Sequence, residues 1–416
     1  MELFFVLLIL LVATRTFGEL AVHMGQPSLV GELIAGILLG VTLGHWTGLM
    51  PELDHLQNNH MLHAITDLGM FFIMLFAGIE MQPHKIFKYS GPSFVVAIGG
   101  MVAPLALGSA LGWAFLPDTP LRFIQAAFIG TALAVTAVPA SVRILLDLGK
   151  LNSRSGQIIV TAAAFDDILS LLVLAWLTGL MSALNGGTGI GPNEFFLLIG
   201  KVAIFFISTA LIGLYVFPLC GRFLSGLKKK EKEMELSALL IAAFAFAVLA
   251  EKLDLHFILG AFVAGVFFGR KTITPKIYED VRNKISGMTF GFLAPVFFAS
   301  IGLNLSLSAF TSIPLFLLLL IFVAFFSKLI GAGGAAYAFG LNRREATAVG
   351  VGMSARGAVE LVIADIALKG GLFIQHGAVF SPVVSHLFSA VVIMAVVTTL
   401  ATPILLKRIY GMDKPK

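Results

Sequence analysis

Two adjacent carboxylates, Asp166 and Asp167, lie in the middle of the apolar stretch TAAAFDDILSLL (161–172). No other charged residue occurs between Ser155 and Met181. Burial raises the proton affinity of a carboxylate, and so does a second carboxylate close by. Such a pair can hold a proton or a metal ion and release one when it takes the other. Neighbouring helical residues diverge by about 100°, so one Asp can meet a fixed partner while the other lines a cavity.

A lysine, Lys328, lies deep in a second apolar stretch, IFVAFFSKLIGAGGAA (321–336). A buried ammonium group needs a partner or must lose its proton. We expect Lys328 to meet Asp166, and the alternative is that its side chain snorkels to the membrane surface. A purely structural ion pair would account for one aspartate and leave Asp167 unexplained.

Other charged residues fall within apolar stretches as well. Arg356 and Glu360 are spaced i, i+4, so they can pair on a continuous helix. If the helix breaks between them, near Gly357, we expect them to neutralise the ends of half-helices, with direct substrate contact as the alternative. For Arg143, near the end of the first interrupted stretch, we expect either the corresponding role of charge compensation or a side chain that snorkels to the membrane surface. Glu32 and Glu80 could line an ion entrance, although a plain interface position is favoured for Glu80.

Composition indicates what kind of molecule holds these groups. Of 416 residues, 58% are hydrophobic and 12% are charged, whereas a soluble domain carries about 25% charged residues. The chain is therefore expected to be a polytopic protein of the lipid bilayer, and a large soluble enzyme is excluded. The net charge of +5 comes from short loops, which argues against a nucleic-acid partner. A single cysteine allows no internal disulfide or thiolate metal site, and we expect no cofactor.

Apolar stretches of about 20 residues predict an all-α protein with about 13 transmembrane helices. We place them near 3–22, 28–44, 61–80, 92–116, 124–146, 155–181, 194–217, 235–252, 255–270, 286–304, 312–338, 345–368 and 378–406. Lys and Arg concentrate in alternate loops, including the charged run 221–235 and the run 270–284. The positive-inside rule then predicts an outside N-terminus and a cytoplasmic C-terminus. We expect the membrane to be the inner membrane of a bacterial or archaeal cell.

The two halves of the sequence contain related segments. GELIAGILLG (31–40) matches GAFVAGVFFG (260–269), and MFFIMLFAGIEM (70–81) matches APVFFASIGLNL (294–305) in the same order. The matched spans run in opposite directions across the membrane, which predicts two inverted six-helix repeats. The expected divisions are 1–181 (first repeat), 182–234 (linker helix and charged loop), 235–410 (second repeat) and 411–416 (cytoplasmic tail). Close helix packing through small residues is a simpler reading of the glycine-rich match.

Interrupted helices occur at corresponding places in the two repeats. The segment 131–145 contains Thr131, Thr136 and Pro139, and the segment 350–364 contains Gly350, Gly352 and Gly357. A simple kink would explain Pro139 alone. Paired breaks that cross at the membrane midplane are instead typical of a transport site, because unwound backbone exposes carbonyls that can bind a cation.

The run TAVPASVRILLDLGKLNSRSGQIIVTAAAFDDILSLLVLA (136–175), together with MSARGAVELVIA (353–364), resembles the monovalent cation:proton antiporter family, second branch. The Asp-Asp pair is similar to that of its sodium/proton exchanging members. The resemblance implies that Asp167 binds Na⁺ and the proton, that Asp166 forms a salt bridge with Lys328, and that Thr136 lies beside the site. It also implies a homodimer in which a core containing both broken helices moves against a fixed scaffold.

We therefore expect a secondary transporter that exchanges Na⁺ or Li⁺ for H⁺ by alternating access. Exchange of two protons per Na⁺ would make it electrogenic, and it would be electroneutral if Lys328 does not titrate. The alternatives are a K⁺/H⁺ antiporter of the same fold and a gated cation channel, for which no filter-like loop is found. An intramembrane aspartyl protease is excluded, because adjacent aspartates cannot converge on one water.

Overall fold

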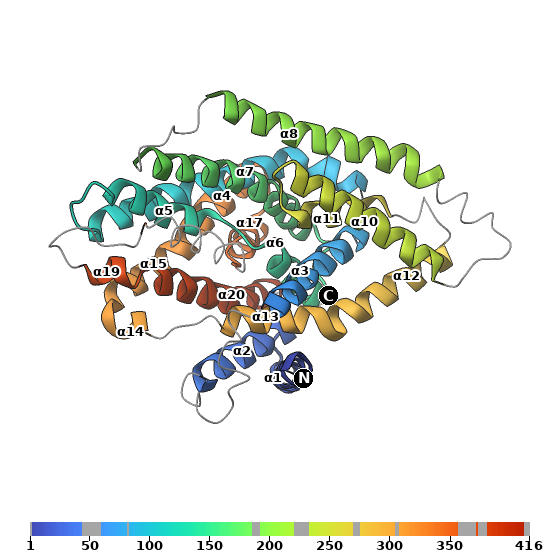
Figure 1. Cartoon of the computed structure of the whole chain (residues 1–416), viewed down its shortest axis with the longest axis horizontal. Coiled ribbons are helices and arrows are strands. Elements are labelled where there is room, and N and C mark those ends of the chain that lie inside the picture. The colour runs from blue at the N-terminus through green and yellow to red at the C-terminus, as the bar shows by residue number, and fades with distance from the viewer. Residues whose placement is uncertain are drawn as a thin grey trace. The chain divides into compact units, whose positions relative to one another are not determined.

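The structure is a computed structural model of the chain that describes residues 2–43, 60–80, 83–184, 192–219, 233–268, 275–303, 308–356, 372 and 381–411. Throughout these ranges the regular secondary structure is helical (Figure 1). Nine helices of the described part are long and apolar enough to cross a membrane, and two shorter apolar helices accompany them. The expected all-helical membrane protein is confirmed, whereas the number thirteen stays a prediction because several spans are described only in part.

The chain divides into two compact units. Unit 1 comprises residues 1–11, 58–88 and 192–297, and unit 2 comprises 12–57, 89–191 and 298–416. These units are defined by contacts within the structure and do not test the repeat boundaries predicted from the sequence, which stay a prediction.

Unit 1 contains a helical group in which one short apolar helix packs against two longer ones. Its helices are α3 (His60–Glu80), α8 (Pro192–Leu211), α10 (Met234–Lys252), α11 (Phe257–Phe267) and α12 (Pro275–Met288), with π-helical turns η3 (Ile212–Val216) and η4 (Thr289–Leu293). The short helix α11 contacts both α3 and α10.

One expectation for unit 1 is wrong, because most of the basic run expected as a loop at 270–284 is helical from Pro275 onward. The helix is amphipathic. Tyr278, Val281 and Ile285 recur on one face and are buried, and the Tyr278 hydroxyl donates to the carbonyl of Ile79 at 2.8 Å. Charge content alone therefore misplaced the start of this helix.

Unit 2 holds most of the remaining helices. They are α1 (Glu2–His23), α2 (Ser28–Leu43), α4 (Pro83–Phe115), α5 (Arg122–Ala134), α6 (Val138–Asp147), α7 (Arg154–Leu184), α13 (Ala294–Leu303), α14 (Ser308–Ser312), α15 (Pro314–Lys328), α16 (Gly334–Ala338), α17 (Arg343–Gly352), α19 (Pro382–Ser385) and α20 (Leu387–Gly411), where α1, α4 and α13 cross a unit boundary. A π-helical turn, η5 (Leu329–Gly333), links α15 to α16. Figure 1 shows α15 and α20 side by side. Between them and α5 lies an apolar core that includes Phe128, Phe316, Leu320, Leu387 and Val391.

Two helical spans of unit 2 are interrupted. Between α5 and α6 the residues 135–137 leave the helical conformation, and Val135 is extended with φ −66° and ψ 147°. Pro139 lies in the first turn of the next helix, α6, where its missing N–H costs no intrahelical hydrogen bond. The second helix, α17, ends at Gly352, and residues 353–356 form a turn followed by two residues without regular secondary structure. The expected break at Gly357 lies outside the described residues.

The matched glycine segments make reciprocal contacts. A Cβ atom added to Gly36 would lie 2.1 Å from the carbonyl oxygen of Ala299, and α13 returns the contact through Gly302. Within unit 1, α3 and α11 meet in the same way through Gly78 and Gly265. In the sequence match Gly36 corresponds to Gly265 and Gly78 to Gly302. In the first half of the chain the matched segments lie in α2 and then α3, and in the second half they lie in α11 and then α13. Each contact therefore joins the first segment of one half to the second segment of the other half, α2 to α13 and α11 to α3. Two related copies would give this reciprocal pattern.

These contacts predict a strong effect of a single methyl group. The variant Gly36→Ala should lose about 1–3 kcal/mol of stability, because the new Cβ must push α2 away from the α13 backbone. The matched control is Gly91→Ala in α4, where an added Cβ meets nothing within 4 Å. Thermal unfolding of the purified protein in detergent measures the difference. Equal melting temperatures for the two variants would contradict the close packing.

Candidate functional site

The ammonium group of Lys328 is the centre of a buried polar site in unit 2. Lys328 is the last residue of α15, and its side chain and that of Asp166 are both 0% exposed. Its Nζ lies 3.4 Å from Oδ2 of Asp166 and donates to Thr136 Oγ1 at 2.7 Å and to the carbonyl of Ala134. The expected ion pair is confirmed. The snorkelling alternative is wrong, because no part of the side chain reaches the surface.

Thr136 connects the two helix breaks. Its hydroxyl accepts a hydrogen bond from Lys328 and donates one to the carbonyl of Met353 at 3.1 Å. The backbone N–H of Ala137 donates to the carbonyl of Ala355 at 3.0 Å. The breaks therefore lie against each other, and each provides partners for backbone groups that the other leaves without an intrahelical bond.

Arg356 supplies a second buried cation at the same place. Its guanidinium is fully buried and donates to the carbonyls of Leu133 at 2.6 Å, Ser354 at 3.1 Å and Ala324 at 3.5 Å. Leu133 and Ala134, the acceptors of Arg356 and Lys328, are the last two residues of α5. The C-terminal end of a helix carries partial negative charge, so both cations stabilise this half-helix end. Glu360, the expected partner of Arg356, lies outside the described residues.

Asp167 places a further carboxylate next to this cluster. It follows Asp166 in α7 and is 4% exposed. One turn later in the same helix, the hydroxyl of Ser170 donates a hydrogen bond to the carbonyl of Asp166 at 2.6 Å. The structure thus contains two consecutive buried aspartates, one of which is held by a lysine from another helix.

A glycine contact brings α4 close to the Lys328 segment. A Cβ atom at Gly331, in the π-helical turn after Lys328, would lie 2.1 Å from the carbonyl oxygen of Gly99. One at the adjacent Gly100 would lie 3.8 Å from Lys328 Nζ. Sequence reasoning did not assign these residues. The paired glycines at 99–100 and 333–334, in two apolar stretches, were the sequence feature that could have indicated this close packing.

A second buried charged cluster lies at the other end of α6. Arg143 is only 6% exposed, and its Nε lies 3.2 Å from Asp147 Oδ1 while its Nη2 lies 3.5 Å from Glu32 Oε1. The same Nη2 donates to the hydroxyl of Ser28 at 2.6 Å. The snorkelling alternative for Arg143 is therefore wrong. Asp147 was missed, although its i, i+4 spacing from Arg143 was visible in the sequence. Glu80, in unit 1, pairs with Arg282, as fits an interface position.

The family described as "Sodium/hydrogen exchanger, transmembrane" matches residues 5–409 of this chain. The chain belongs to this sodium/hydrogen exchanger family. A relative in the family, the Na(+)/H(+)-K(+) antiporter GerN of Bacillus cereus, is 32% identical over 99% of this chain and 97% of its own length. The Na(+)/H(+) antiporter of Enterococcus hirae is 29% identical over 98% of both chains.

Among solved structures, the sodium proton antiporter MjNhaP1 from Methanocaldococcus jannaschii has the same fold. It matches with a TM-score of 0.68 over 99% of this chain and 98% of its own, at 16% sequence identity. The expected antiporter fold is confirmed by this match. Membership of a transporter family also agrees with the expectation that the chain is not an enzyme.

The buried pair predicts a characteristic pattern of stabilities. Lys328→Gln should cost about 3–5 kcal/mol, because it leaves the charge of Asp166 buried without its ammonium partner. The double variant Lys328→Gln with Asp166→Asn should recover a large part of this loss. Lys276→Gln, at an exposed site in α12, is the control and should change stability by less than about 0.5 kcal/mol. Thermal unfolding in detergent compares the three variants with the wild type, and a double variant no more stable than Lys328→Gln alone would contradict the coupling of the pair.

Proposed function

We propose that this protein exchanges Na⁺ for H⁺ across the membrane by alternating access. The observation that carries the proposal is the buried Lys328–Asp166 pair, followed in α7 by a second buried carboxylate and placed against two helix breaks. The printed names of GerN and of the Enterococcus hirae relative both give Na⁺ and H⁺ as the exchanged ions. Burying an ionisable group inside a membrane is costly, and such groups are therefore candidates for a role in transport.

In the proposed mechanism Asp167 takes either a proton or Na⁺. Among the described residues no three His, Cys, Asp or Glu side chains gather as a metal site. The proposed Na⁺ shell is therefore made of oxygens, from Asp167, Asp166 and the hydroxyl of Thr136, with backbone carbonyls freed by the helix breaks. The same carboxylate cannot hold both ions, so the two compete, and this competition couples their movements.

In the proposed mechanism Asp167 exchanges the first proton, and Lys328 supplies the second. Its ammonium is held by Asp166, Thr136 and the end of α5. A cation that enters between the carboxylates weakens the attraction of Asp166 for Lys328, and the lysine can then release a proton. Two protons per Na⁺ would make the exchange electrogenic. Arg356 stays charged throughout and keeps the α5 end neutralised while Lys328 changes state.

Several finer assignments belong to the same proposal. We place the protein in the second branch of the monovalent cation:proton antiporters on the strength of its Asp-Asp motif. We also propose a homodimer in the inner membrane of a bacterial or archaeal cell, with an outside N-terminus and a cytoplasmic C-terminus. The basic residues at the start of α17 and at the end of α20 support this orientation.

Transport by proteoliposomes tests the proposal directly. With a pH-sensitive dye inside, addition of Na⁺ should change the internal pH, and Asp167→Asn should abolish the response because an amide cannot bind and release the proton. Asp118→Asn is the matched control, since its side chain is 96% exposed. Wild-type vesicles that respond to none of Na⁺, Li⁺ and K⁺ would overturn the proposed function. Full activity in Asp167→Asn would remove this residue from the ion site.

The same vesicles separate Na⁺ from K⁺ exchange. K⁺/H⁺ exchange is the second candidate because the printed name of GerN includes K⁺. The Na⁺ response should weaken at acid pH and recover at higher Na⁺ concentration, because protons and Na⁺ compete for one carboxylate. A larger response to K⁺ than to Na⁺ at equal concentration would favour the second candidate.

The charge moved per cycle tests the role of Lys328. Exchange by the wild type should speed up or slow down with an imposed membrane potential, whereas Lys328→Gln, if active, should lose this dependence because the glutamine has no proton to release. A potential set by K⁺ and valinomycin, with Na⁺ as the exchanged ion, provides the measurement. A wild type that ignores the potential would contradict the two-proton scheme and leave Na⁺/H⁺ exchange itself intact.

A further inference from the structure

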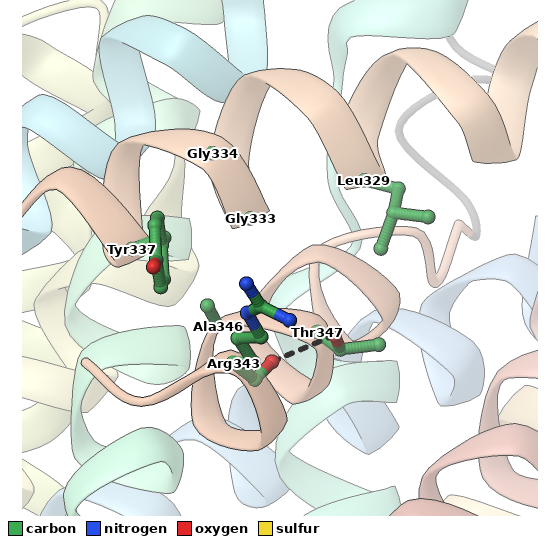
Figure 2. Close-up of a pocket in the computed structure, with 7 residues that line it drawn as sticks. All are labelled: Leu329, Gly333, Gly334, Tyr337, Arg343, Ala346 and Thr347. Carbon is green, nitrogen blue, oxygen red and sulfur yellow. Dashed lines mark hydrogen bonds between the residues drawn. The ribbon is translucent and has the colours of Figure 1, made fainter.

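A surface groove of about 370 Å³ lies between the η5–α16 segment and the first turns of α17, within unit 2 (Figure 2). It is lined by Leu329, Gly333, Gly334, Tyr337, Arg343, Ala346 and Thr347. None of these residues takes part in the ion site described above. One end of the groove is polar and the other is apolar, so it suits an amphipathic molecule.

The polar end is made by Arg343. In the run NRRE its neighbours have structural partners: Arg344 donates to the carbonyl of Tyr410 at 2.9 Å, and Glu345 forms a capping box with Asn342. The side chain of Arg343 has no ion pair or hydrogen bond to any residue that the structure describes. Figure 2 shows its guanidinium directed into the groove between Tyr337 and Thr347. The Thr347 hydroxyl is already bonded to the backbone carbonyl of Arg343 at 2.7 Å.

The apolar end belongs to a membrane span. Residues 314–338 form one of the candidate spans, and Tyr337 is near its end. From Tyr337 to Leu329 the groove follows the helix for eight residues, about 12 Å, toward the membrane interior. Gly333 and Gly334 add no side chains to its wall, and a Cβ atom at Gly334 would meet nothing within 4 Å. Adjacent to the groove the lipid-facing surface continues through Ile330, which is 51% exposed.

We propose that this groove binds one anionic phospholipid. The phosphate pairs with the guanidinium of Arg343 beside the ring of Tyr337, and an acyl chain lies along Leu329 and the two glycines. Basic pockets between transmembrane helices recognise anionic head groups, and tyrosine is favoured at the membrane–water boundary. A free phosphate ion would use only the polar end. The bound lipid joins α16 to α17, and therefore joins the helix of Lys328 to the one that leads to Arg356.

Lipid addition to the delipidated, full-length protein in detergent tests this proposal. Native mass spectrometry counts bound lipids, and thermal unfolding measures their effect. Phosphatidylglycerol should bind about fivefold more tightly than phosphatidylcholine, which corresponds to the attraction of one arginine for an anionic lipid. In Arg343→Gln this preference should disappear. Arg408→Gln removes the same charge from an exposed site in α20 outside the groove and should retain the preference.

A second variant tests the apolar end without removing a charge. Gly334→Leu fills the groove from a position where the new side chain meets open space, and leucine favours the helix more than glycine does. It should lose phosphatidylglycerol binding while the protein stays folded and active in the ion assay. Phosphatidylglycerol binding that survives in both Arg343→Gln and Gly334→Leu would overturn the proposal. So would inorganic phosphate that stabilises the wild type as well as the lipid does, because the ligand would then be the phosphate group alone.

Discussion

The structure depends on keeping a fully buried ammonium group satisfied in a membrane interior that offers no water. Lys328 meets this requirement with oxygens from three segments: the end of α5, the break that follows it and α7. In a continuous helix the carbonyls of Leu133 and Ala134 would bond to N–H groups one turn later. The break in α5–α6 releases them for Lys328 and Arg356. Broken helix and buried cations are therefore mutually dependent, since each would be strongly unfavourable without the other.

This arrangement also suits the proposed exchange, in which the site changes its protonation and its occupant in every cycle. The attraction within a buried ion pair is nearly cancelled by the cost of removing both charges from water. The Lys328–Asp166 pair is thus held in place without being deeply stabilised, so a proton or a cation can replace one of its interactions at modest cost. Arg356 has a different role, because a guanidinium keeps its charge under all physiological conditions. In the proposed cycle Arg356 keeps the α5 end neutralised while the charge of Lys328 changes.

Glycine determines how closely the helices around these groups approach. Where Gly36 faces Ala299 or Gly331 faces Gly99, backbones come so close that no side chain fits between them, and the contact is fixed in register. Where a glycine instead faces outward, as Gly334 does, it leaves a depression in the lipid-facing surface. The same residue type therefore sets both the internal packing around Lys328 and the shape presented to the bilayer.

The sequence by itself determined the membrane class, the approximate spans and the pairing of Lys328 with Asp166. These follow from one-dimensional rules: hydrocarbon requires long apolar stretches, and a charge inside such a stretch requires an opposite charge. The tertiary structure decided which carbonyls receive Lys328 and Arg356, that Arg143 is buried with Glu32 and Asp147 instead of snorkelling, and that the basic run from Pro275 onward is helical. Each of these outcomes depends on contacts between segments distant in the chain or on which face of a helix is covered. Composition and spacing cannot supply that information, because the same local pattern is stable in either environment until a particular neighbour packs against it.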